Sequence, residues 1–320
     1  MTTYKGIKGF NIQSVSSDPP APFEGQVWYN TSSNTVKYFA ILSAAWATGA
    51  AMASVKYKFA GAGIETAGVV FGGNNPGNPS PLTNATEEYN GTSWSTGGNM
   101  SVARSAHGGA GTQTAALAFG GDEPPNENVT EEYNGSSWTN GGNLNTGRKY
   151  LAGCGTQTAG LAFAGPNSGT ATEEYNGSSW TNGGALNRGQ GKLAGAGTQT
   201  AGLAIGGASD PDKVEEYNGS SWTNGGDLNT GRDGNAGAGT QTAAITFGGE
   251  PLGTPGAATE QYNGSSWTSV ANMGTARYRL AGFGTKTSAI AAGGESASGI
   301  TGLTEEWSEG GPATLTVGTD

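Results

Sequence analysis

The sequence predicts an all-β protein with the architecture of a β-propeller, and three observations support this prediction. A phrase close to TEEYNGSSWTNGG, complete at Thr130–Gly142, recurs along the chain, and the tryptophans of five successive copies lie 42 to 45 residues apart. Polar and apolar residues alternate with the period of a strand, and glycine recurs in the first strand of every unit. Four short antiparallel strands in about 40–45 residues form one propeller blade, and helical repeats lack these features.

The composition fits one repeat array and argues against several classes of function. The chain has 320 residues, 59 glycines and a net charge of −10. The glycines fall at fixed repeat positions, where they suit turns and close packing. No basic stripe is present to bind nucleic acid or an anionic membrane surface. The one cysteine, Cys154, excludes an intrachain disulfide, and we expect an inert buried thiol because most sister repeats carry alanine there.

The chain begins with two segments that precede the repeats. Residues 1–24 are polar and end in a proline-rich run, which predicts an extended N-terminal attachment segment. Residues 25–53 predict a hairpin followed by a closing strand. QVWYN and TVKYF alternate around a polar turn, and the sequence around Trp46 matches the tryptophan strand of the later repeats.

Residues 54–320 predict a propeller of about six four-stranded repeats. Each unit contains a first strand, a TQT-like turn, a second strand ending in most copies at Gly-Gly, a variable loop, and an EEY strand joined to a tryptophan strand by Asn-Gly. Asn-Gly predicts a tight hairpin turn because both residues tolerate positive φ. Six units and a strand from the N-terminal segment predict six blades closed by the termini. A seventh blade, built from residues 25–48, is the alternative.

The order of Arg, Gly-Gly, Glu-x-Tyr and Trp over residues 54–307 resembles the kelch repeat. This resemblance implies a kelch-type propeller of the galactose-oxidase-like class. Two features depart from the kelch pattern: Asn-Gly-Ser-Ser replaces the usual Tyr-Asp turn, and Gln190 stands where sister repeats have Arg or Lys. The near-identity of the units resembles kelch-like tail and virion proteins of marine bacteriophages. The opening TYKGIKGFNIQSVSSDPPAPFEGQVWYNTSSNTVKYF is similar to virion-attachment segments of phage tail-fibre proteins, which implies attachment through Tyr4, Phe10, Trp28 and Tyr29.

The repeated glutamates and tryptophans are interpreted as structural. Paired carboxylates are typical of glycosidases, but an active site needs one asymmetric pair, whereas this glutamate recurs in every unit. We expect each one to meet a repeated Arg or a backbone donor and to fix how blades dock. The lone His107 cannot build a usual zinc or copper site and is expected to be satisfied or solvent-facing. The structural residues are Glu87, Glu131, Glu173, Glu215, Glu260, Glu305, Trp94, Trp138, Trp180, Trp222 and Trp267.

The loops that follow the second strands differ most between copies, and in a propeller they emerge on one face. Loops carry function on rigid scaffolds, so this loop face is the candidate binding surface. Drift without function is the alternative. The candidate ligand-binding residues are Asn75, Asn78, Asp122, Glu123, Asn126, Asn167, Asp210, Asp212, Glu250 and Glu295.

The sequence therefore predicts a non-enzymatic component of a phage virion, made in the host cytoplasm and placed in a tail or tail fibre. Its N-terminus would attach to other virion proteins, and its loop face would meet a host surface glycan, a receptor or a neighbouring virion protein. We expect no catalytic residue, metal, cofactor, nucleic acid or membrane insertion, and a homo-oligomer within the particle is possible. A cellular interaction adaptor and a carbohydrate-active enzyme are the alternatives.

Overall fold

The computed structural model describes residues 12–77, 81–122, 128–165, 169–250 and 256–317, and within these ranges it contains strands but no helix. The described residues therefore include no helix that could cross a membrane. The chain divides into two compact units. Unit 1 comprises Met1–Ala44 and Glu309–Asp320, and unit 2 comprises Ala45–Ser308. The all-β class is confirmed, and the described strands include seven four-stranded sheets of the kind found in propellers and other repeat proteins.

Unit 1 contains one sheet with the strand order β1-β2-β3-β30. The expected hairpin is present, with Asn30 opposite Thr35 at its turn. A short strand pairs in parallel with the other side of β2. The bounds are β1 (Gln13–Val15), β2 (Val27–Asn30), β3 (Thr35–Leu42) and β30 (Gly311–Thr316).

Asp18 ties the proline-rich run to this sheet. Its Oδ1 accepts hydrogen bonds from Trp28 Nε1 at 3.0 Å and from Asn30 Nδ2 at 2.8 Å, and Lys37 Nζ lies 2.8 Å from Oδ2. These bonds, that from Lys37 first, lower the pKa of Asp18 to about 2. Residues 18–30 therefore follow a defined path rather than a purely extended one.

The repeat region ends at Ser308 and not at residue 320, the boundary predicted from the sequence. Gly311–Thr316 pairs antiparallel with β3, so the last residues belong to unit 1. The expected segment 25–53 is likewise divided between the units after Ala44. The sequence GPATLT has no feature that selects its partner among the available strand edges, and the partner here is about 270 residues distant.

Unit 2 contains six sheets of four strands, five of them built from consecutive strands. The first is β5 (Ala60–Ile64), β6 (Ala67–Phe71), β7 (Thr86–Tyr89) and β8 (Trp94–Thr96). The second is β9 (Gly108–Thr112), β10 (Ala115–Phe119), β11 (Thr130–Tyr133) and β12 (Trp138–Asn140). The third is β13 (Ala152–Thr156), β14 (Ala159–Phe163), β15 (Thr172–Tyr175) and β16 (Trp180–Asn182). The fourth is β17 (Ala194–Thr198), β18 (Ala201–Ile205), β19 (Val214–Tyr217) and β20 (Trp222–Asn224). The fifth is β21 (Ala236–Thr240), β22 (Ala243–Phe247), β23 (Thr259–Tyr262) and β24 (Trp267–Val270).

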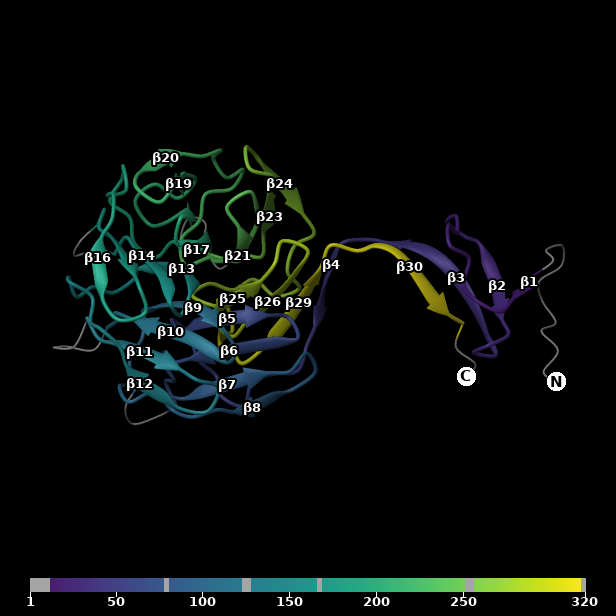
Figure 1. Cartoon of the computed structure of the whole chain (residues 1–320), viewed down its shortest axis with the longest axis horizontal. Helices are drawn as coiled ribbons and strands as arrows, with labels where there is room; N and C mark the ends of the chain where they lie inside the picture. Colours follow the sequence, from purple (N-terminus) through teal and green to yellow (C-terminus); the bar gives the residue numbers. More distant parts are fainter. Residues whose placement is uncertain (1–11, 78–80, 123–127, 166–168, 251–255, 318–320) are drawn as a thin grey trace. The chain divides into compact units, whose positions relative to one another are not determined.

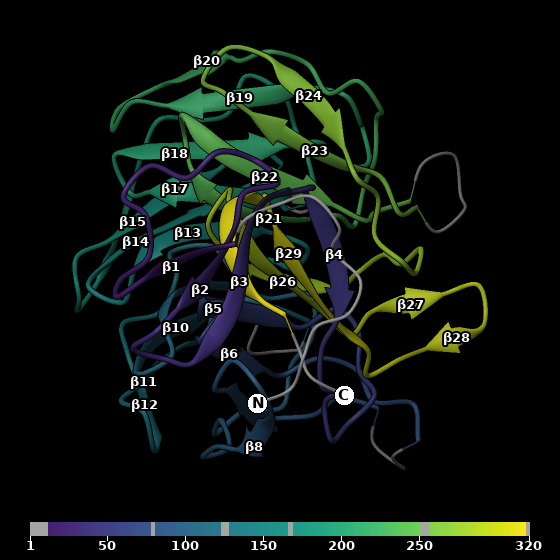
Figure 2. The same cartoon turned by 90° about the vertical axis from the view of Figure 1, so that its right-hand side faces the viewer.

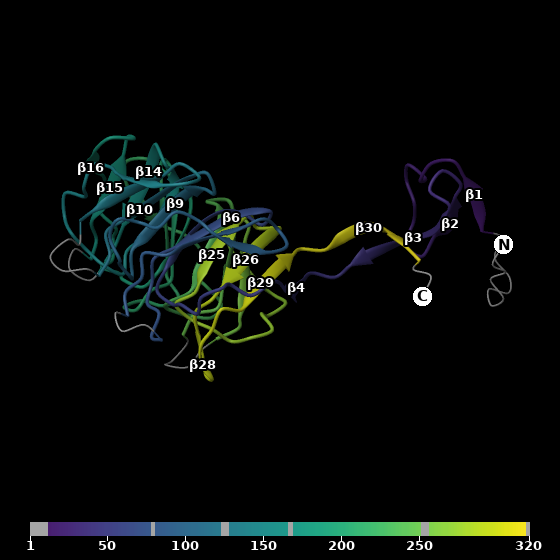
Figure 3. The same cartoon turned by 90° about the horizontal axis from the view of Figure 1, so that it is seen from below.

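The sixth sheet joins the two ends of unit 2. Its order is β25-β26-β29-β4, and Trp46 of β4 lies opposite Trp307 of β29. Figures 1 and 3 show β4 beside β29. Between β26 and β29, β27 and β28 form a separate hairpin (Figure 2). The bounds are β4 (Ala45–Thr48), β25 (Ala281–Gly284), β26 (Ser288–Ala292), β27 (Glu295–Ser296), β28 (Gly299–Ile300) and β29 (Thr304–Ser308).

The Asn-Gly turns are four-residue loops rather than the expected two-residue turns. In the second sheet, Tyr133 pairs with Trp138, which leaves residues 134–137 as the loop. Gly135 has a φ of 88°, whereas Asn134 is not among the residues with positive φ. The Asn134 Oδ1 instead accepts the N–H groups of Ser136 and Ser137 at 3.0 and 2.9 Å. The asparagine is thus selected for its side-chain acceptor.

Neighbouring sheets of unit 2 meet through their first strands. β5 contacts β9, and this continues through β13, β17, β21 and β25, which in turn contacts β5. Figure 1 shows these strands innermost and the tryptophan strands outermost. In most sheets a tryptophan donates its Nε1–H to a threonine of the preceding sheet, and Trp46 bonds to Thr259 Oγ1 and Trp94 to Thr304 Oγ1, both at 3.0 Å. Trp267 bonds instead to the carbonyl of Gly226, because Val214 replaces the threonine.

The second glutamate of each EE doublet also joins neighbouring sheets. Tyr133 donates its hydroxyl hydrogen to Glu88 Oε1 of the preceding sheet at 2.6 Å, and equivalent bonds recur at four other interfaces. The interface between the fifth and sixth sheets has Trp307 in place of tyrosine and Gln261 in place of glutamate. Both donate to the Lys286 carbonyl. The two departures from the repeat occur together. A tryptophan has no hydroxyl group to donate to a carboxylate, so a glutamate at position 261 would lack the partner that it has in the other repeats.

In five of the six repeats the first glutamate lies in a buried ion pair, whereas the prediction was that each would meet a repeated Arg or a backbone donor. The pairs are Lys56–Glu87, Arg104–Glu131, Arg148–Glu173, Arg232–Glu260 and Arg277–Glu305. Both partners are buried in each pair. Each pair joins the connection that leads into a sheet to the third strand of the same sheet. The expectation that these glutamates fix the docking of neighbouring blades is therefore wrong, because the pairs do not span two sheets. In the fourth sheet Glu215 accepts the N–H groups of Asn187 and Arg188 and the Nδ2 of Asn187, without a guanidinium from position 190.

Candidate functional site

The candidate site is built on six equivalent residues that precede the first strands of unit 2. These axial residues are Lys58, Ala106, Tyr150, Lys192, Gly234 and Arg279. Each donates its N–H to the carbonyl of the axial residue in the preceding sheet, at 2.6–2.9 Å, and Lys58 donates to Arg279. Short bridges such as Tyr57 to Asn74 and Ser105 to Asp122 join the neighbouring residues to the variable loops. The axial residues therefore lie on the predicted loop face.

All six axial residues have left-handed backbone conformations, with φ between 52° and 61°. The hydrogen bonds between them fix this conformation. Gly234 shows that glycine serves at this position, and a non-glycine residue there costs about 1 kcal/mol or more. Five of the six positions nevertheless carry side chains. Backbone strain retained in this way is typical of functional positions.

The axial side chains concentrate positive charge in an acidic protein. They line a depression of about 110 Å³ together with the residues that follow them, such as Phe59 and Leu151. Lys58 Nζ lies over the ring of Tyr150 at 5.4 Å and over that of Tyr57 at 5.3 Å. Three of the six residues are cations and none is an acid.

Three of the predicted loop residues form ion pairs with basic residues of the connections that carry the axial residues. Asp122 lies 3.0 Å from Lys149 Nζ, and Glu295 lies 3.3 Å from Arg279 Nη1. Asp210 lies 4.0 Å from Arg188 Nε. The remaining described candidates make more local contacts: Asp212 pairs with Lys213, Glu250 bridges to Asp233, and Asn75 Oδ1 accepts the Gly77 N–H. Asn78, Glu123, Asn126, Asn167, Tyr4 and Phe10 lie outside the described residues.

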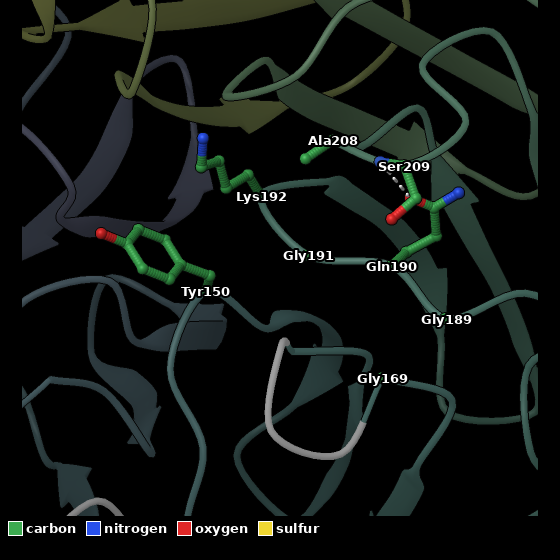
Figure 4. Close-up of a pocket in the computed structure, with 8 residues that line it drawn as sticks. All are labelled: Tyr150, Gly169, Gly189, Gln190, Gly191, Lys192, Ala208 and Ser209. Carbon is green, nitrogen blue, oxygen red and sulfur yellow. Dashed lines mark hydrogen bonds between the residues drawn. The ribbon is translucent and has the colours of Figure 1, made fainter.

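A larger pocket adjoins the axial residues of the third and fourth repeats. Its volume is about 410 Å³, and Figure 4 shows Tyr150 and Lys192 on one side of it and Gln190 and Ser209 on the other. Gly169, Gly189, Gly191 and Ala208 complete the lining. The Ser209 N–H donates to Gln190 Oε1 at 3.3 Å. This pocket occurs beside the one position where Gln replaces the buried Arg or Lys.

His107 lies in the wall of the axial depression and is 6% exposed, so of the two alternatives expected for it, a satisfied or a solvent-facing side chain, the solvent-facing one is wrong. Its ring lies 5.6 Å from that of Phe71. Burial, and then the charge of Arg104, lowers the pKa of His107 to about 3. The imidazole is therefore neutral, and it fills a place that leucine takes in three sister repeats.

Replacement of His107 by leucine is expected to stabilise the protein more at pH 4.5 than at pH 7.5. Below its ordinary pKa of 6.5 the unfolded histidine binds a proton that the folded one excludes, so stability falls from pH 6.5 toward pH 3. The difference between variant and parent should grow by about 2–3 kcal/mol between the two pH values. Urea unfolding at both pH values measures it. An unchanged difference would contradict this, because it would show that the folded imidazole binds a proton as readily as the unfolded one.

Cys154 is 6% exposed, and burial raises the pKa of its thiol to about 12, which agrees with the inert role predicted for it. Within the described ranges, no group of three or more His, Cys, Asp or Glu side chains is placed to hold a metal ion. Among the described residues, the repeated carboxylates form ion pairs or accept hydrogen bonds from tyrosine hydroxyl groups.

Sequence reasoning did not identify the axial residues. One signal was available, because this position reads K, A, Y, K, G and R in successive repeats while the residue after it is mostly apolar. A divergent position beside a constant one indicates a surface held by a fixed scaffold. No protein-family model matches the chain, and no curated protein is significantly similar to it in sequence.

Proposed function

We propose that unit 2 is a six-bladed propeller of kelch type, closed by β4. The first strands contact one another in a cycle, and β4 supplies the fourth strand of the sixth sheet. The axial hydrogen bonds include one from Lys58 to Arg279, which joins the first repeat to the last. The seven-bladed alternative is disfavoured because the remaining sheet lies in unit 1 and pairs with the C-terminal strand.

We further propose that the protein is a non-enzymatic binding component of a phage particle, placed in a tail or tail fibre. The observation that carries the binding role is the set of axial residues, which keeps charged and aromatic side chains at a strained position on the loop face. The phage assignment rests on the resemblance of the repeats and the N-terminal segment. The partner on the loop face is a host surface glycan, a receptor or a neighbouring virion protein.

Unit 1 suits attachment to another chain. The described residues of unit 1 form a single sheet without a second layer, and among them only Trp28 and Asn30 are buried. Phe23 is 70% exposed and Ile41 is 51% exposed. A single sheet of this size needs further packing for independent stability. Other virion proteins, or equivalent units in a homo-oligomer, would supply it. Trp28 therefore supports the sheet from within, and the half-buried Tyr29 remains a candidate contact.

Two alternative functions receive less support. A carbohydrate-active enzyme would need an asymmetric pair of carboxylates in a cavity, whereas the repeated glutamates are held in ion pairs and by tyrosine hydroxyl groups. A cellular adaptor would use the same loop face without unit 1. The attachment of unit 1 to a particle therefore distinguishes an adaptor from a virion component.

Mass spectrometry of purified phage particles tests the proposal. Particles produced with the full chain should contain it, and particles produced with a chain lacking residues 1–44 should not. The truncated chain should still fold, as judged by its circular dichroism, because β4 begins at Ala45. Absence of the full chain from particles would contradict the phage role and favour the adaptor.

A further inference from the structure

We propose that the pocket beside Tyr150 and Lys192 binds an acidic sugar residue of a saccharide, with its carboxylate directed to the axial cations. This inference rests on the proposed binding role of the loop face and specifies the ligand. It commits to a saccharide with carboxylate groups rather than to a neutral glycan or an acidic peptide.

The pocket exists because the fourth repeat departs from the others. The equivalent Arg side chains are 0–1% exposed and donate to backbone carbonyls and a glutamate, whereas the shorter Gln190 accepts the Ser209 N–H of the variable loop through its Oε1. Glycines at 189 and 191 add no side-chain volume on either side. The resulting volume of about 410 Å³ falls in the range of small-ligand sites, roughly 300–1,000 Å³.

The lining of the pocket suits a sugar ring. Tyr150 offers an aromatic face, against which the C–H groups of a pyranose pack. The amide of Gln190 and the hydroxyl of Ser209 lie across the pocket from it (Figure 4) and match the donors and acceptors of sugar hydroxyl groups. A small number of polar groups around an apolar wall is the usual composition of a specific ligand site.

The charges favour an acidic ligand. Lys192 has one carboxylate in reach, that of Asp233, at the long distance of 3.7 Å. Lys58 contacts two tyrosine rings and has no ion pair among the described residues. Arg279 is paired with Glu295 at 3.3 Å. A carboxylate between Lys192 and Lys58 would gain charge-assisted hydrogen bonds from groups that lack strong partners.

The shape of the site favours a saccharide over an acidic peptide. The larger hollow lies between the third and fourth repeats, beside the axial residues Tyr150 and Lys192, where it can take a compact ring. The axial depression itself is only about 110 Å³. A peptide that used the cations alone would leave the Tyr150–Ser209 pocket without a role.

Titration calorimetry on the full chain tests the proposal with three acidic probes: trigalacturonate, trimannuronate and sialyllactose. Maltotriose and lactose serve as neutral counterparts, and a hexaglutamate peptide serves as the alternative ligand. At least one acidic saccharide should bind roughly tenfold or more tightly than its neutral counterpart, since one ion pair of this kind corresponds to about a tenfold change in Kd. Its affinity should fall when sodium chloride is raised from 50 to 300 mM.

Three variants locate the site, and the repeat itself supplies residues that fit each position. Lys192→Ala places an alanine at a position equivalent to Ala106, which has a similar positive φ, and Tyr150→Ala does likewise. Gln190→Arg restores the residue of the sister repeats and should fill the pocket without loss of stability. Each should weaken binding at least tenfold, whereas Lys149→Ala, which removes the neighbouring lysine paired with Asp122, should change it less than twofold.

The outcomes separate this inference from the proposed function. Failure of all acidic saccharides to bind, equal binding of neutral sugars, or unchanged affinity in all three variants would overturn it. Tighter binding of hexaglutamate through Lys58 and Lys192 would overturn the saccharide assignment and leave the loop face as a binding face. The proposed virion role fails separately, through absence of the chain from particles.

Discussion

Replacement of Arg148 by methionine is expected to lower the free energy of unfolding by about 3–5 kcal/mol, because it leaves a buried carboxylate without its cation. Arg148 is fully buried and donates to Glu173, to the Thr146 carbonyl at 3.1 Å and to the Ala162 carbonyl at 3.3 Å. The connection into the third sheet is thereby fixed to β15. Chemical denaturation followed by circular dichroism measures the loss.

Two further variants show that the unpaired charge is the cause. The double change Arg148→Met with Glu173→Gln removes the charge and retains an acceptor for the Asn145 N–H, which Glu173 binds at 2.7 Å. It should therefore cost less than Arg148→Met alone. In the fourth repeat, Gln190→Arg should raise the free energy of unfolding by about 1–3 kcal/mol by supplying a partner to Glu215. Equal losses in the single and double variants would contradict this explanation.

Replacement of Trp46 by alanine is expected to lower the stability of unit 2 by about 3 kcal/mol or more. Trp46 lies on β4, which comes from the start of unit 2 and completes a sheet formed by its end. Its ring packs edge-on to Phe247 at 4.8 Å, and its Nε1 donates to Thr259 Oγ1 of the fifth sheet. Loss of these contacts would free β4 and expose the edge of β29 to aggregation.

Trp28→Ala is the matched control, since it removes a buried tryptophan from unit 1. It should leave the unfolding of unit 2 unchanged, whereas Trp46→Ala should shift it to lower denaturant. Similar effects of the two changes would mean that β4 does not hold the two ends of unit 2 together.

The repeat made much of unit 2 predictable. Fixed spacing placed the strands, and the match between Trp46 and the later tryptophans identified β4 as a repeat strand, because equivalent residues occupy equivalent positions. The arginine–glutamate pairs followed from the same argument, since a charge that recurs in every unit must be satisfied in every unit. Where one partner changed, the other changed with it, as Gln261 and Trp307 illustrate.

The features that were not predicted depend on contacts distant in sequence or on backbone geometry. Gly311–Thr316 pairs with β3, and the local sequence does not indicate which of the many strand edges it will join. The axial residues escaped detection because their left-handed conformation, with Lys58 at a φ of 56°, is imposed by hydrogen bonds between repeats rather than by residue type. The pocket at Gln190 could not be predicted without knowing that the Arg or Lys at the equivalent position of the other repeats is buried.

Native-state hydrogen exchange at the amide of Lys58 tests the closure of unit 2 most directly. This N–H donates to the Arg279 carbonyl at 2.9 Å, and it is the one axial bond that joins the first repeat to the last. The account predicts that the Lys58 amide is protected as strongly as those of Ala106, Tyr150, Lys192 and Gly234, and that Trp46→Ala reduces its protection first. Rapid exchange at Lys58 beside slow exchange at the other four would contradict a closed ring, and with it the arrangement of the axial residues on which the binding site depends.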